Sequence, residues 1–379
     1  MSSFSAADSA FMARALRLAE RGRYAAHPNP MVGCVLVRDG AVVGEGWHEF
    51  AGAAHAEINA LHSAGSSAKG ATAYVTLEPC SHHGKTPPCA PALAEAGIVD
   101  VVIAMRDPFP EVHGSGIAML EESGITVRSG LMEGAAAELN AGFLSRVQRR
   151  RPFVRLKVGA SLDGAIAMKS GESQWITGPA ARADVQKLRA RSGAILTGIG
   201  TVLADDPALT VRDDRLDTRG RQPLRAVLDT RLRMPLSASM LDMQGSTVVY
   251  CSVDSRRGEL AGVDVVKVAS DEDNVDVAAV LTDLAEREIN EVLVEAGPTV
   301  SGYLLSRRLV DELVIYQAPH IMGSETMPMF HTPTWGALRD RLELDIVDLR
   351  RIGGDMRITA RTVSYTHLTL PTTGHECIC

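Results

Sequence analysis

The chain has 379 residues, 45% of them hydrophobic and 22% charged, with a formal net charge of −7. This length predicts two domains, and the acidic balance argues against a general nucleic-acid binder. No apolar run approaches the roughly 18 residues of a membrane span. The N-terminus has no basic segment followed by an apolar stretch, so we expect no secretory signal and a cytoplasmic protein.

Residues 1–147 alternate between helical and strand patterns. Apolar spacing predicts a helix over 5–22, followed by strands over 34–38 and 41–47. Asp39-Gly40, between the two strands, is typical of a hairpin turn. Further helices are expected over 54–64, 87–96, 118–123 and 136–144, and further strands over 71–77, 99–105 and 125–127. This alternation predicts a layered α/β domain, in which Cys34 is a core residue.

A set of zinc-type ligands runs through this domain. His55 opens H-A-E-I-N-A-L, and Cys80 and Cys89 lie in L-E-P-C-S-H-H-G-K-T-P-P-C. One nitrogen and two thiolates suit tetrahedral zinc, and three protein ligands leave a position open for water, as in catalytic sites. Zinc can lower the pKa of bound water to roughly 7. Glu57 has the position of the proton-shuttling Glu of zinc deaminases.

The spacing leaves a structural alternative open. Eight residues separate Cys80 from Cys89, where the usual deaminase motif has two. Gly and Pro residues in the insert would let it fold as a loop. His82 or His83 could instead supply a fourth ligand and close the site as a structural zinc knuckle. Asn29, between two prolines, is either a turn former or a polar group held for a ligand.

A basic run over residues 146–151 precedes Pro152, and we interpret it as a solvated linker. Strand–turn–helix units follow. The turns at 198–201 and 297–299 are either ordinary tight turns or the phosphate sites of a nucleotide cofactor. Lys157 and Glu295, at or near strand ends, either line a ligand crevice or form a surface ion pair.

Together these motifs resemble the bifunctional riboflavin-biosynthesis deaminase–reductase family. The matching segments are H-P-N-P-M-V-G, H-A-E-I-N-A-L, T-L-E-P-C-S-H-H-G-K-T-P-P-C, K-V-G-A-S-L-D-G, S-G-E-S-Q-W-I-T-G, T-V-L-A-D-D-P-A-L-T and V-E-A-G-P-T. The long insert between the cysteines is itself typical of that family. The resemblance implies a cytidine-deaminase-like three-layer domain over 1–147 and a dihydrofolate-reductase-like domain over 152–362. Residues 364–379 resemble translated read-through, so we expect a non-native or disordered tail.

The resemblance also implies the chemistry, with Zn²⁺ and NADPH as cofactors. The implied substrate is a small molecule, 2,5-diamino-6-ribosylamino-4(3H)-pyrimidinone 5′-phosphate. The first domain would replace one ring amine by a carbonyl, with Glu57 as the catalytic proton shuttle. The second would use NADPH to reduce the ribosyl group, giving 5-amino-6-ribitylamino-uracil 5′-phosphate. The family forms homo-oligomers, and we expect no nucleic-acid or membrane partner.

Site residues in the second half follow from the same resemblance. Those expected to contact the substrate are Lys157, Ser173, Arg189, Leu209, Arg212 and Glu295, and Asn29 is the candidate in the first domain. Those expected to contact NADPH are Ala160, Trp175, Ile176, Thr201, Asp205, Gly297, Pro298 and Thr299. Arg212 also suits phosphate by its own chemistry, because guanidinium pairs with phosphate oxygens bidentately. Without the resemblance, Trp175 could be a core residue and Asp205 a helix cap.

Three other interpretations stay open. A nucleic-acid-editing zinc deaminase would use the same chemistry, but the acidic balance and the whole second half argue against it. A non-enzymatic, zinc-stabilised binding module would unfold on chelation and would be unaffected by Glu57→Gln. A chain with one surviving activity is disfavoured because the motifs of both halves are intact.

Overall fold

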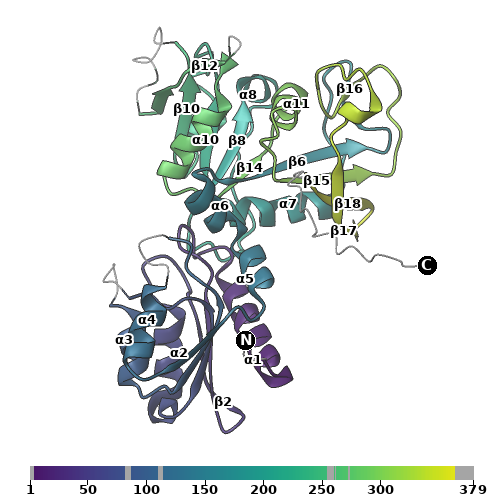
Figure 1. The fold of residues 1–379 in the computed structure, drawn as a ribbon. Helices are drawn as coiled ribbons and strands as arrows, with labels where there is room; N and C mark the ends of the chain where they lie inside the picture. Colours follow the sequence, from purple (N-terminus) through teal and green to yellow (C-terminus); the bar gives the residue numbers. More distant parts are fainter. Residues whose placement is uncertain are drawn as a thin grey trace, which may run out of the picture.

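The computed structural model describes residues 4–81, 87–109, 114–253, 260, 262–271 and 274–362. The expected tail over 364–379 and the candidate ligands His82 and His83 lie outside these residues. Two main sheets organise the chain, one of five strands in the N-terminal unit and one of nine strands in the C-terminal unit (Figure 1). No helix in the described segments combines the length and apolar character that a membrane span requires.

The first sheet has the strand order β2-β1-β3-β4-β5. Its strands are β1 (Gly33–Arg38), β2 (Ala41–Trp47), β3 (Thr72–Leu77), β4 (Asp100–Met105) and β5 (Thr126–Ser129). β1 is antiparallel to β2 and β3, whereas β3, β4 and β5 run parallel. Asp39 and Gly40 join β1 to β2 with φ of 52° and 76°. Two left-handed residues match the type I′ hairpin turn, so the predicted hairpin is confirmed.

Helices cover both faces of this sheet. They are α1 (Ala6–Ala19), α2 (Ala56–Ala64), α3 (Cys89–Glu95), α4 (Ser115–Glu122), α5 (Glu133–Leu139) and α6 (Ala141–Arg149), with short 3₁₀ turns at Glu20–Gly22 and Gly65–Ala68. α2, α3 and α4 lie on one side of the sheet and α1 and α5 on the other (Figure 1). Cys34 and Leu36 of β1 pack in the cluster with α2, α3 and α4, whereas Val35 and Val37 pack in the cluster with α1 and α5. Alternate residues of a strand face opposite sides, so the predicted three layers and the core position of Cys34 are confirmed.

The second sheet has the order β11-β10-β9-β8-β14-β6-β15-β18-β17. Its strands are β6 (Phe153–Ser161), β8 (Ala194–Gly198), β9 (Leu224–Leu228), β10 (Thr247–Cys251), β11 (Asp264–Lys267), β14 (Glu291–Val294), β15 (Glu312–Ala318), β17 (Leu344–Ile352) and β18 (Asp355–Thr362). Neighbours run parallel from β11 to β15, and β18 and β17 are antiparallel. Small two-stranded sheets pair β7 (Ala165–Met168) with β16 (Thr326–Pro328) and β12 (Ser270–Asp271) with β13 (Asn274–Val275).

Both faces of the second sheet are also covered. Its helices are α7 (Pro179–Arg191), α8 (Ile199–Asp205), α9 (Ser239–Asp242), α10 (Val277–Glu286) and α11 (Pro298–Ser306), with a 3₁₀ turn at Leu338–Asp340. α10 and α11 contribute to one apolar cluster with β6 and β8, and α7, α8 and α9 to the other. Interior strands such as β8 and β14 are buried along their whole length, as expected for largely apolar strands covered on both faces.

The basic run over 146–151 forms the last turn of α6 and the two residues after it. It is not a solvated linker, so that interpretation is wrong. Arg149 and Arg151 pair with Asp311 at 2.8 and 2.7 Å. Arg146 Nε donates to Asn290 Oδ1 at 2.6 Å. α6 lies where the two units meet (Figure 1), and its arginines fasten the first unit to the second. A run of like charges predicts a solvated segment when no partner is visible nearby in the sequence. Here the acidic and amide partners lie about 150 residues away.

Candidate active sites

Three elements bring the predicted zinc ligands together. His55 is the N-cap of α2 with an extended backbone, where we expected it inside the helix, Cys80 follows β3, and Cys89 begins α3. His55 Nδ1 lies 3.5 Å from Cys80 Sγ and 3.3 Å from Cys89 Sγ. The ligand atoms all lie within 4.8 Å of one another. Zn–N and Zn–S bonds of about 2.0 and 2.3 Å place tetrahedral ligands about 3.5 Å apart, so this donor set fits zinc.

Glu57 is in the first turn of α2, beside the ligand cluster. Its carboxyl is buried, with 3% of the residue exposed. Burial raises the pKa of Glu57 to about 7. A carboxyl whose pKa lies near the working pH can both accept and return a proton, which is the property a shuttle requires. The hydrogen bond between the two cysteines lowers the pKa of Cys80 and raises the pKa of Cys89. Cys80 is therefore the readier of the two to become the thiolate that binds metal.

Glycine in β2 sets the position of α2. A Cβ on Gly46 would lie 2.3 Å from Ala56 O and 2.4 Å from Ala60 N. Side chains do not tolerate such approaches, so glycine is required for the helix backbone to lie directly on the strand. The contact fixes where the start of α2 presents His55 and Glu57.

Glu78 holds the other side of the site, and the sequence reasoning missed it. The residue is 3% exposed and lies between the end of β3 and Pro79-Cys80. Its carboxylate accepts hydrogen bonds of 3.0–3.3 Å from the backbone N–H groups of Asp107, Gly114, Gly116 and Ile117. These bonds tie the Cys80 segment to the start of α4. A charged residue directly after an apolar strand was the available signal.

Asn29 is connected to the ligand cluster through His48. Its Nδ2 is 3.0 Å from His48 Nε2, and His48 Nδ1 is 3.2 Å from Ala54 O. These partners select the neutral tautomer in which Nδ1–H donates to Ala54 and Nε2 accepts from the amide. The ring of His48 meets the ring of His55 edge-on, with centroids 5.7 Å apart. The sequence reasoning missed His48.

In the second unit, Lys157 and Glu295 are part of a buried cluster. Glu295 directly follows β14 as expected, but Lys157 lies in the middle of β6, so its predicted place near a strand end is wrong. Lys157 Nζ lies 3.0 Å from Glu295 Oε2, and Arg189 Nε donates to Glu295 Oε1 at 2.6 Å. Arg189 also donates to Thr210 O at 3.0 Å. Burial would raise the pKa of Glu295, but Arg189 and Lys157 outweigh it and hold that pKa well below its usual range. Glu295 is only 9% exposed, so the surface-ion-pair alternative is wrong.

The two predicted turns lie side by side. Gly198 and Gly297 are the N-caps of α8 and α11, at the ends of the neighbouring strands β8 and β14. The backbone N–H of Gly297 donates to Thr201 Oγ1 at 3.2 Å, and a Cβ on Gly198 would lie 2.8 Å from Val300 Cγ2. Ligand crevices of α/β sheets form at the carboxyl ends of such strands, so one ligand can reach both turns.

The structural alternatives for Trp175, a core residue, and for Asp205, a helix cap, are both wrong. Trp175 is 68% exposed with Arg182 over its ring at 4.4 Å, so it is not a core residue. Asp205 is the last residue of α8 and therefore not its N-terminal cap. Ala160 is buried in β6, and Thr299 Oγ1 lies 3.4 Å from His331 Nδ1.

The other predicted contacts are more dispersed. Leu209 is 3% exposed with a left-handed φ of 47°, so its side chain is in the core and its backbone forms the turn. Arg212 is exposed, and its backbone N–H donates to Gln186 Oε1 at 2.8 Å. Ser173 and Ile176 are half-buried in the segment before α7. Pro298 is the first residue of α11.

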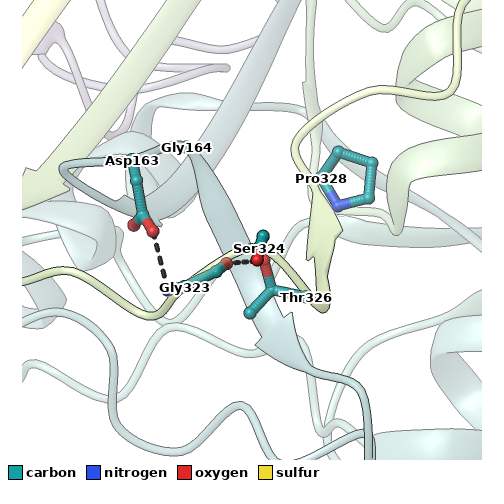
Figure 2. A pocket seen from close by; sticks show the side chains of 6 residues that line it. All are labelled: Asp163, Gly164, Gly323, Ser324, Thr326 and Pro328. Carbon is teal, nitrogen blue, oxygen red and sulfur yellow. Dashed lines mark hydrogen bonds between the residues drawn. The ribbon is translucent and has the colours of Figure 1, made fainter.

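A separate hollow lies at the small sheet of β7 and β16. Figure 2 shows its lining, which is Asp163, Gly164, Gly323, Ser324, Thr326 and Pro328. Asp163 accepts hydrogen bonds from Gly323 N at 2.8 Å and from Ser161 Oγ at 2.5 Å. The carboxylate is thus occupied in closing the turn, and none of the predicted site residues lines this hollow.

Comparisons with known proteins identify the family of each unit. Residues 5–105 match the family described as "Cytidine and deoxycytidylate deaminase zinc-binding region", and residues 152–358 match "RibD C-terminal domain". The riboflavin biosynthesis protein RibD of Escherichia coli is 48% identical over 92% of this chain and 98% of its own length, and that of Haemophilus influenzae is 45% identical over 95% and 98%.

Solved structures give the same result. RibD of Acinetobacter baumannii superposes with a TM-score of 0.89 at 43% identity, covering 94% of this chain and 99% of that one. A Thermotoga maritima protein, described as a diaminohydroxyphosphoribosylaminopyrimidine deaminase and 5-amino-6-(5-phosphoribosylamino)uracil reductase, gives 0.82 at 34% identity with the same coverage. The chain therefore belongs to the RibD family of riboflavin biosynthesis proteins, as a bifunctional enzyme with a zinc-dependent deaminase and an NADPH-dependent reductase.

Proposed function

We propose that the chain converts 2,5-diamino-6-ribosylamino-4(3H)-pyrimidinone 5′-phosphate in two steps, deamination of the ring and then reduction of the ribosyl group. The observation that carries the proposal is the convergence of His55, Cys80 and Cys89 beside the buried carboxyl of Glu57. The activities named for the Thermotoga maritima protein support the choice of substrate. The product would be 5-amino-6-ribitylamino-uracil 5′-phosphate.

In the deaminase site, His55, Cys80 and Cys89 would hold zinc, whose chemistry when bound is to activate water. The carboxylate of Glu57 takes a proton from the attacking water and delivers it to the departing ring amine. The raised pKa of Glu57 suits both transfers. Asn29 contacts the pyrimidine, and its hydrogen bond with His48 fixes the direction of its amide.

In the reductase site, NADPH supplies the hydride when bound. The residues that contact the ribosyl group are Lys157, Arg189 and Glu295. Glu295 forms ion pairs with both Lys157 and Arg189, and these pairs fix the positions of the three charged groups. Arg212, which is exposed, can pair with the substrate phosphate. The remaining assignments are Ser173 and Leu209 to the substrate, and Ala160, Trp175, Ile176, Thr201, Asp205, Gly297, Pro298 and Thr299 to NADPH.

We assign residues 1–147 to the deaminase domain and 152–362 to the reductase domain. α6 ends at Arg149 and β6 begins at Phe153, which supports a boundary between them. Zinc binding needs Cys80 and Cys89 as reduced thiolates, which supports a cytoplasmic location.

We also propose a homo-oligomer built on β17. This strand is the edge of the nine-stranded sheet, and unpaired edges invite pairing with another chain. Its apolar residues Leu344, Ile346, Val347 and Leu349 are 39–60% exposed. An apolar edge of this kind marks a surface for protein association.

Mass analysis of the products tests the two-step proposal. Without NADPH, the purified zinc-loaded protein should convert the diamino compound to the deaminated compound, with the ribosyl group unreduced. With NADPH, the product should gain two further hydrogens. A product that is reduced but keeps its ring amine would contradict the proposed order.

A further inference from the structure

The loop of residues 27–31 belongs to the deaminase unit but is held by the reductase unit. Asn290, directly before β14, donates from Nδ2 to Pro28 O at 2.8 Å. Arg146 Nε donates to Asn290 Oδ1 at 2.6 Å. That second bond fixes the amide with its nitrogen toward Pro28, because the oxygen is already engaged.

Two further contacts confine the same loop. Asn140 accepts from Met31 N at 2.8 Å and donates to Met31 O at 2.9 Å. A Cβ on Gly193, which precedes β8, would lie 2.7 Å from His27 Cε1. The loop is therefore clamped at both ends, and two of the three contacts come from the reductase unit.

The loop leads directly to the deaminase site. Asn29, the residue after Pro28, reaches His48 Nε2 at 3.0 Å, and His48 Nδ1 reaches Ala54 O at 3.2 Å, next to His55. The His48 and His55 rings are also in edge contact. A shift of Pro28 would therefore move the Asn29 amide relative to the metal ligands.

We propose that Asn290 of the reductase domain is a positioning residue for the deaminase site, acting through the backbone of Pro28 on the side chain of Asn29. This inference rests on the proposed contact between Asn29 and the substrate. The deaminase then depends on its fused partner for its full rate. Both ends of the Asn290 amide are engaged at the junction of the two units, Nδ2 by Pro28 O and Oδ1 by Arg146 Nε.

Asn290→Ala removes the hydrogen bonds to Pro28 and Arg146. Loss of the bond to Pro28 should lower kcat/KM for ammonia release roughly three- to tenfold. Zinc content and NADPH oxidation with the deaminated compound should stay at wild-type values. Glu138→Gln is the matched control, because it weakens the Arg361–Glu138 contact between the same two units away from the loop. It should leave both activities unchanged.

A double-mutant cycle separates positioning from general destabilisation. If Asn290 acts through Asn29, adding Asn290→Ala to Asn29→Ala should cause no further loss of deamination. Gly193→Ala, which pushes a methyl group against His27, displaces the same loop without changing Asn290. This variant should also lower the deamination rate and leave the reductase rate intact.

The outcomes distinguish the two claims. Wild-type deamination by Asn29→Ala would contradict the proposed substrate contact. Loss in Asn29→Ala with wild-type rates in both Asn290→Ala and Gly193→Ala would contradict the positioning role alone. Multiplicative losses in the double variant would also overturn it.

Discussion

The two active sites differ in how they are assembled. The deaminase site takes its ligands from residues 55–89, where two helix starts and a strand end converge on one point. The reductase cluster joins residues from 157 to 295, in the middle of β6, directly after β14 and on α7. In the first, the donor atoms point toward a place for an ion. In the second, opposite charges already satisfy one another. Metal loss should therefore silence the first site without altering the second.

Zinc removal is the strongest way to test that difference. Chelation followed by desalting should reduce ammonia release from the diamino compound to background, because the water-activating group is gone. NADPH oxidation with the deaminated compound should continue at the wild-type rate. Zinc added back should restore ammonia release. Loss of both activities on chelation would show that the sites are not independent.

Glu295→Gln tests the reductase cluster. The change leaves Lys157 and Arg189 without their counter-ion in a buried place, which costs about 3–5 kcal/mol of unfolding free energy. Urea unfolding would measure this loss, and the reductase rate should fall while ammonia release persists. Glu325→Gln is the control, since its pair with Lys169 is exposed and worth about 0–1 kcal/mol. Equal effects of the two variants would contradict the buried-cluster account.

Gly46→Ala tests the seating of α2. A Cβ there meets the helix backbone at 2.3 Å, so we expect about 1–3 kcal/mol of destabilisation and a slower deaminase. Gly134→Ala is the control, because a Cβ at Gly134 of α5 meets nothing within 4 Å. It should be neutral or slightly stabilising in a thermal melt. A neutral Gly46→Ala would mean that α2 has room to move.

The smallest expected effect is a pH dependence at Glu291, at the start of β14. Burial would raise its pKa, but Arg191 and Arg155 outweigh this and lower it from 4.5 to about 2. A carboxyl with a depressed folded-state pKa stabilises the fold above its unfolded pKa and loses that contribution as pH falls from 4.5 toward 2. The loss at pH 4 should be about 1 kcal/mol. Unfolding of wild type and Glu291→Gln across pH 6–4 should differ in slope, and parallel curves would contradict this assignment.

The sequence was most informative about the deaminase site, whose residues lie within a short stretch of the chain. The spacing of His55, Cys80 and Cys89 predicted a ligand set that the structure brings together. The strand and helix patterns predicted the first layered unit, whereas the fold of the second followed from the family resemblance. The reductase residues were identified through family motifs, because Lys157 and Glu295 are adjacent only in the folded sheet. Their roles stay predictions.

What sequence missed has one physical cause. Glu78, His48 and Asn290 act through hydrogen bonds to backbone atoms or side chains distant in sequence. The hydrophobic periodicity of a sequence predicts helices and strands, but it does not predict hydrogen bonds between distant residues. The basic run was misinterpreted for the same reason. Its partner Asp311 directly precedes β15, far away in the sequence.

The most direct test of two ordered sites in one chain follows NADPH oxidation by wild type and Glu57→Gln. With the diamino compound, wild type should oxidise NADPH, and the variant should be slower by about 10²–10⁴-fold because it lacks the proton shuttle. With the deaminated compound, both should oxidise NADPH at the same rate. Equal NADPH oxidation by the variant and wild type with the diamino compound would contradict the account, since reduction would then not require deamination.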